Sequence, residues 1–172
     1  MPTRPSYTAA TAMPQLTSLL KQIINDHTQF GFVLGDDFVW SPDGRQIMYK
    51  KPAHLADIWT LLHEVAHAKL GHTSYDLDIE LVTREVEAWE HARVSLAPLY
   101  GLHIDPDHIE DHLDTYRLWL HERSRCPNCR QNGLQTTKNT YSCNNCRCLW
   151  RVNEARICRL KRTRLPVRDH SS

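Results

Sequence analysis

Four cysteines toward the C-terminal end constrain the fold of this chain more than any other feature. They form two C-x-x-C pairs, Cys126–Cys129 and Cys143–Cys146, with 13 residues between the pairs. Each pair favours a tight turn that presents two thiolates, and two such turns complete a tetrahedral zinc site. The segment between them, GLQTTKNTYS, is typical of a short hairpin. We therefore predict a zinc ribbon over 125–152, with a closed site whose zinc is structural and stabilises the folded unit.

Two further cysteines, Cys148 and Cys158, lie outside these pairs. Cys148 follows Cys146 by two residues and could replace it as a ligand, but we expect both to be non-ligand thiols. The N-terminal MPTRPSYTAATAMPQL lacks the continuous apolar core of a signal peptide, and no apolar run approaches the roughly 18 residues of a membrane span. We therefore expect a cytoplasmic protein, in which reducing conditions favour metal ligation over disulfides.

The distribution of charge divides the chain near Ser124. Residues 125–172 hold 11 Lys and Arg against 2 Asp and Glu, a net charge of +9, whereas 1–124 hold 10 against 18, a net charge of −8. This asymmetry indicates two units of different chemistry. The expected segments are a flexible arm over 1–14, a main domain over 15–124, the ribbon over 125–152 and a basic tail over 153–172.

The main domain mixes helical and strand patterns. A helical apolar stripe occupies Leu16–Ile24, and short apolar runs broken by turn residues over 31–49 predict a three-stranded antiparallel meander. A long helix follows Pro52 and ends at Gly71, which is suited to a C-cap. Further helices are expected over 78–99 and from Asp105-Pro106, an N-cap followed by proline. The fold class is therefore α+β, with a small antiparallel three-stranded sheet packed on a helical core.

The sequence His63-Glu64-Val65-Ala66-His67 matches H-E-x-x-H within the helix that follows Pro52. Histidines at i and i+4 project from one helix face, so both imidazoles can reach one metal ion. Zinc with three protein ligands keeps a fourth position open, where it acidifies water and polarises a carbonyl. We predict His63 and His67 as ligands of a catalytic zinc and Glu64 as the general base.

The next helix offers a third ligand. Glu85 lies in the middle of the apolar arc of this helix, and a buried carboxylate is costly unless it is paired or bound to a metal. Glu87 falls on the polar face and is expected to be a solvated charge. His72 is the other candidate, but Gly71 and His72 follow His67 at four and five residues, not at the three and six of a metzincin. His72 could stabilise an oxyanion, although we favour a place just after the helix C-cap.

The segments HEVAHAKLGH and EVEAWEHA together resemble the ImmA/IrrE family of small zinc metallopeptidases. The resemblance spans roughly 55–99 and implies a zincin-type core, with His63, His67 and Glu85 of an E-x-x-A motif as zinc ligands and Glu64 as the base. The family usually has Asn or Asp after that alanine, where this chain has Trp89. Some members cleave a DNA-bound repressor, so the resemblance implies a protein substrate of that class.

Basic residues follow the second cysteine pair and point to a second partner. Arginines and lysines near a ribbon that bears Tyr141 and Trp150 could bind phosphates and stack bases. A solubilising tail, or a strip that docks on the acidic main domain, would show the same composition. The candidate nucleic-acid contacts are Arg147, Trp150, Arg151, Arg159, Lys161, Arg162 and Arg164.

Three functions fit these observations. The first is a zinc metallopeptidase with one catalytic and one structural zinc, acting on a protein substrate and not at a membrane. The second is a protease that acts on DNA-associated proteins and is similar to the SprT family. That family pairs H-E-x-x-H with a zinc ribbon but takes its third ligand from a downstream H-G motif, and here Gly71-His72 has the reverse order. The third is a non-enzymatic nucleic-acid or protein adaptor, for which Trp89 is the main support.

Overall fold

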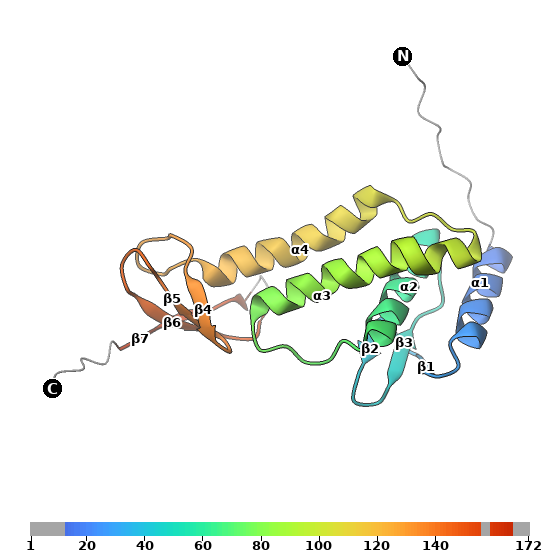
Figure 1. Cartoon of the computed structure of the whole chain (residues 1–172), viewed down its shortest axis with the longest axis horizontal. Helices are drawn as coiled ribbons and strands as arrows, with labels where there is room; N and C mark the ends of the chain where they lie inside the picture. The colour runs from blue at the N-terminus through green and yellow to red at the C-terminus, as the bar shows by residue number, and fades with distance from the viewer. Residues whose placement is uncertain (1–12, 156–158, 167–172) are drawn as a thin grey trace, which may run out of the picture. The chain divides into compact units, whose positions relative to one another are not determined.

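The computed structural model describes residues 13–155 and 159–166 (Figure 1). Cys158 and the first twelve residues of the expected arm lie outside this part. Within it no helix combines the length and the apolar composition that a membrane crossing requires. The elements in chain order are α1 (Met13–Asp26), β1 (Gly31–Leu34), β2 (Val39–Ser41), β3 (Gln46–Tyr49), α2 (Leu55–Leu70), α3 (Asp78–His91), η1 (Ala92–Leu96), η2 (Ala97–Tyr100), α4 (Pro106–Ser124), β4 (Leu134–Thr137), β5 (Thr140–Ser142), β6 (Leu149–Val152) and β7 (Arg162–Leu165).

The chain forms two compact units, and its fold is α+β. The first unit contains the described residues up to His72 together with Ala88–Ile104, and the second contains Thr73–Glu87 and the residues from Asp105 onward. The division falls inside α3, which is one continuous helix. The units therefore do not follow the domain boundary expected near Ser124, because α4 belongs with the cysteine-bearing segment.

The sheet of the first unit is mixed, so the predicted antiparallel meander is wrong. The strand order is β1-β3-β2, with β1 parallel and β2 antiparallel to β3. The central strand carries Ile47, which is fully buried, whereas Val33 and Val39 on the flanking strands are exposed. The link from β1 to β2 crosses β3 at Gly35, where a Cβ would lie 2.6 Å from the Met48 sulfur. Turn signals in the sequence located the strands but not this crossing.

Helix α2 forms as its sequence pattern predicts. At its N-terminus the Asp57 carboxylate accepts hydrogen bonds from the backbone amides of Ala53 and His54, and its C-terminus closes on Gly71 at a φ of 70°. These contacts satisfy terminal backbone groups that the helix leaves unpaired. One face buries the apolar side chains Ile58, Leu61, Leu62, Val65 and Ala66. This face fixes which residues of the H-E-x-x-H motif point inward.

The helix expected over 78–99 is α-helical only as far as His91. It continues as the π-helical turn η1 and the short 3₁₀ segment η2, which ends at Gly101 with a φ of 65°. A π-helical turn widens the backbone hydrogen-bond spacing, and such turns often lie beside functional sites. Here Ala92, Leu96 and Ala97 remain buried through the irregular segment.

The second unit joins α4 to a four-stranded antiparallel sheet. Helix α4 begins at Asp105, whose side chain accepts a hydrogen bond from the Asp107 amide, with Pro106 at the first helical position. The sheet has the order β4-β5-β6-β7 and includes Arg162–Leu165, which the sequence had placed in a tail. Its core contains Tyr141 and Trp150, which stack with ring centroids 5.5 Å apart.

Candidate metal sites

The two motif histidines lie together on the buried side of α2. His63 and His67 are 5% and 8% exposed, and their Nε2 atoms are 3.0 Å apart. Four residues of helix separate them, which places both rings on one face as predicted. Two ring nitrogens that converge in a buried position are suited to hold one metal ion.

Aromatic and imidazole contacts fix the planes of both rings. The Trp89 indole stacks on the His63 ring at 4.2 Å between centroids and 22° between planes. The Nδ1 atom of His67 lies 2.8 Å from Nδ1 of His72. The His67 nitrogen that faces away from His63 is therefore engaged by a second imidazole. The group of candidate ligands does not include His72, which follows the C-cap residue Gly71 and contacts the candidate ligand His67 directly.

Glu85 joins the histidines as a third candidate ligand. It lies one turn before Trp89 on the continuous helix α3, and it is 5% exposed. One ligand atom each from His63, His67 and Glu85 lies within 4.8 Å of the other two. Burial lowers the pKa of His112, and the Glu85 carboxylate opposes that shift. Glu87, by contrast, is exposed, as its place on the polar face predicts.

Glu64 is partly exposed and contacts the edge of the sheet. Its Oε2 accepts a hydrogen bond of 2.7 Å from the backbone amide of Trp40, in strand β2. The Trp40 indole donates a second bond of 2.8 Å to the carbonyl of His72, just past the end of α2. Trp40 therefore links the edge strand both to Glu64 and to His72. No local sequence pattern indicates the role of Trp40, because its contacts join residues far apart in the chain.

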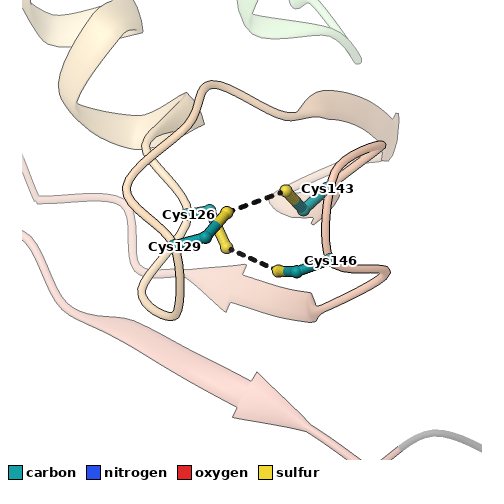
Figure 2. Close-up of side chains that lie close together, drawn as sticks. All are labelled: Cys126, Cys129, Cys143 and Cys146. Carbon is teal, nitrogen blue, oxygen red and sulfur yellow. Dashed lines mark hydrogen bonds between the residues drawn. The ribbon is translucent and has the colours of Figure 1, made fainter.

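The four paired cysteines converge in the second unit. Figure 2 shows their side chains pointing toward one another from two separate loops. The Sγ atoms of Cys126 and Cys146 are 3.6 Å apart, and those of Cys129 and Cys143 are 3.4 Å apart. Both distances far exceed the roughly 2.05 Å of a disulfide bond. The four thiols form one group that could hold a metal ion.

The surroundings lower the pKa of Cys126 and of Cys129 but raise the pKa of Cys143 to about 11. A hydrogen bond from the Asn145 side chain and one from the Gln131 backbone lower the pKa of Cys129 to about 6. The thiolate is the form that binds metals. Cys148 stands outside the group, and its Sγ is 3.7 Å from the carbonyl oxygen of Leu149. It lies where a non-ligand thiol was expected.

One predicted nucleic-acid contact requires correction. Trp150 is fully buried, and its indole nitrogen donates to the carbonyl of Arg123. It stacks on Tyr141, which is 1% exposed, so neither ring can stack on a base. Arg162 is half-buried against Glu122, and Arg164 donates to Pro127 and Asn128. The other predicted basic contacts, Arg147, Arg151, Arg159 and Lys161, are exposed.

The sequence also did not predict the buried pair of Asp78 and Arg123. Their side chains are 3% and 2% exposed, and the Arg123 Nη2 atom donates to Asp78 Oδ1 at 3.1 Å. The Tyr141 hydroxyl donates to the same carboxylate. A charged residue at the end of an amphipathic helix normally faces solvent, so nothing in the local pattern signals this pair.

Comparisons with known proteins do not identify a family for this chain. No family model, no curated protein and no solved structure matches it.

Proposed function

We propose that this protein is a zinc-dependent peptidase that carries a second, structural zinc. The observation that supports this most is the buried group of His63, His67 and Glu85 beside a partly exposed Glu64. Three protein ligands leave one position for substrate or water, which is the arrangement of catalytic zinc. The resemblance of the two helical motifs to the ImmA/IrrE family agrees with this assignment. The substrate we infer is a protein, of which a DNA-bound regulator is the class that the resemblance suggests.

The distances between the ligand atoms fit zinc at both groups. Zinc–nitrogen bonds of about 2.0–2.1 Å in a tetrahedron place two nitrogens roughly 3.3 Å apart, and His63 and His67 are 3.0 Å apart. Zinc–sulfur bonds of about 2.3 Å place two sulfurs roughly 3.8 Å apart, close to the measured 3.6 and 3.4 Å. Two imidazoles and a carboxylate suit a catalytic ion, and four thiolates suit a structural one.

Glu64 is the residue that moves the proton in this proposal. Zinc bound by the histidines and Glu85 would acidify water and polarise a peptide carbonyl. Glu64 follows a ligand directly and is partly exposed, so its carboxylate can accept the proton of the attacking water. It then delivers that proton to the leaving nitrogen. The amide of Trp40 holds the carboxylate in place by a hydrogen bond to Oε2.

Strand β2 offers a place for an extended substrate. It lies at one edge of the sheet, where a further strand can pair once it displaces the Glu64 carboxylate from the Trp40 amide. The Trp40 amide points out of this edge toward Glu64, which shows that the edge and the base adjoin. A peptide added to β2 would therefore run past the proposed metal position. This geometry favours cleavage within a chain over removal of a terminal residue.

The decisive experiment combines metal analysis with cleavage by the full chain. We expect two zinc ions per molecule, one of which is lost in His63→Ala and the other in Cys126→Ser. Glu64→Gln should retain both ions and lose cleavage of an unfolded protein or a peptide library by about 10²-fold or more. Glu87→Gln, the same change at an exposed position of α3, should retain full activity.

Two results would contradict the proposal. Full activity of Glu64→Gln would exclude the general-base role. A His63→Ala variant that folds and still binds two zinc ions would exclude the histidine site. In the second case the protein would be an adaptor whose metal is held by the cysteines alone.

A further inference from the structure

We propose that the second unit binds the phosphate backbone of duplex nucleic acid in a groove beside the first cysteine turn. The groove has a volume of about 500 Å³ and lies between the end of α4, the Cys126–Arg130 turn and strand β7. We call it the arginine groove. Its lining residues are Glu122, Arg125, Cys126, Pro127, Arg130 and Arg162. The inference uses only residues of the second unit and does not depend on peptidase activity.

The lining of the arginine groove is positively charged. Apart from Cys126, it contains three arginines and one carboxylate, a net charge of +2 for these four residues. The carboxylate of Glu122 is already engaged, with Oε2 2.7 Å from Arg162 and Oε1 3.8 Å from Arg125. The acid therefore neutralises part of the positive charge of Arg162 and Arg125, and removing its charge would leave both guanidiniums free for an anion. A planar guanidinium matches two phosphate oxygens at once, so such a lining selects phosphate.

Within the described residues, the charge of Arg130 has no ion-pair partner. Its side chain is exposed, and among the described residues none pairs with its guanidinium. Its backbone has a φ of 65°, in the left-handed region that glycine and asparagine occupy at lower cost. Arg147 stands at the same place after the second cysteine pair, with a φ of 57°. Both left-handed positions belong to the cysteine turns, in which the Arg130 and Arg147 amides donate to the carbonyls of Cys126 and Cys143.

The aromatic rings of the segment 125–172 bear on whether a duplex or a single strand is bound. The sequence from 125 to 172 contains no Phe, one Tyr (Tyr141) and one Trp (Trp150). Both are buried, so this segment has no such ring on which a base could stack. Binding of single strands depends strongly on such stacking. Duplexes present one charge per roughly 1.7 Å of helix, and binding through phosphates alone suits them. The segment's net charge of +9 would add long-range attraction.

The test measures binding of the zinc-loaded full chain to a short fluorescent duplex of arbitrary sequence at several salt concentrations. Arg130→Asn removes the charge and keeps a residue that tolerates the left-handed backbone. Loss of one phosphate contact should weaken binding about 8-fold at about 0.1 M salt and lower the salt slope by about 0.9. Arg147→Asn is the matched control outside the groove and should change both quantities much less, because it removes only long-range attraction. Equal losses in the two variants would show attraction by net charge alone and overturn the groove.

A second variant tests the opposite sign. Glu122→Gln removes the negative charge of the groove, while Arg162 stays in place through its bond to the Glu122 carbonyl. This variant should bind the duplex more tightly than the unchanged protein, and weaker binding would overturn the proposal. Polyglutamate and a single-stranded oligonucleotide serve as competitors. Preference for polyglutamate would assign the groove to an acidic protein, and preference for the single strand would refute recognition through duplex phosphates.

Discussion

Arg123→Met should destabilise the second unit severely, because it removes the partner of a carboxylate that water does not reach. The Arg123 and Asp78 side chains are 2% and 3% exposed, and Nε of the arginine lies 2.5 Å from Oδ2 of the aspartate. The same guanidinium donates at 2.6 Å to the carbonyl of Asn153 and at 2.6 Å to the side chain of Asn139. It also lies over the Trp119 ring, 4.6 Å from its centroid. One side chain therefore joins α3, α4 and the loops of the sheet.

The expected cost follows from what remains after the change. Removing one partner of a buried ion pair costs about 3–5 kcal/mol, because the other charge stays buried without compensation. The Tyr141 hydroxyl still donates to Asp78, which keeps the cost within that range. With a urea dependence of about 2 kcal/mol per molar, the unfolding midpoint should fall by roughly 1.5–2.5 M. The double variant Arg123→Met with Asp78→Leu should recover much of this loss, since it leaves no buried charge.

The assay is urea unfolding of the zinc-loaded chain, followed by tryptophan fluorescence. Arg117→Met is the matched control on the same helix, because Arg117 is exposed and pairs with Glu110 and Asp114 at the surface. It should move the midpoint little, since exposed ion pairs contribute little to stability. If Arg123→Met unfolds at the same midpoint as Arg117→Met, the buried pair does not stabilise the second unit as we expect. The same conclusion follows if the double variant is no more stable than the single one.

Two further predictions concern the packing around Gly133 and the effect of His27 on the pH dependence of stability. Gly133→Ala should cost about 1–3 kcal/mol in urea unfolding, because a Cβ there would collide with the Trp150 ring and lie 2.5 Å from the Ser142 carbonyl oxygen; Gly44→Ala, where the nearest atom is 3.4 Å away, is the control and should be neutral. Burial, and secondarily the charge of Lys69, lower the pKa of His27, so the unfolded chain binds more protons and stability should fall as pH drops below about 6.5. His27→Gln should reduce this loss between about pH 7.5 and 5.5, and an unchanged pH dependence would contradict the assignment.

Local patterns were sufficient to predict the helices and the candidate ligands. The spacing of His63 and His67 fixes a common helix face, and the apolar arc of α3 places Glu85 on its buried side. Capping residues such as Gly71 and Asp105 marked helix ends correctly, because these signals act within a few residues. The cysteine pairs predicted a common site for the same reason, since each turn is short.

Features that depend on contacts between distant residues could not be predicted in this way. The position of β3 between its neighbours depends on burial of Ile47 and on the crossing at Gly35. The burial of Trp150 depends on Tyr141 and on the Arg123 carbonyl, so a ring that seemed free to stack on bases is part of the core. The sequence signals for surface and core are the same for an aromatic residue in a short strand, and only tertiary packing separates them.

Trp89 shows how packing can take over a task that a polar residue performs elsewhere. A second partner normally orients a metal-binding histidine through a hydrogen bond, and the candidate ligand His67 has such a partner in His72, at 2.8 Å. At His63 the Trp89 indole lies parallel to the ring and limits its rotation by contact over a whole face. Stacking fixes the plane of the imidazole but does not choose which nitrogen carries the proton. The same indole surrounds the site with apolar surface, which strengthens the attraction between the buried ligands and a cation. Trp89 is therefore compatible with a working metal site, and its presence is a weak argument for a scaffold without activity.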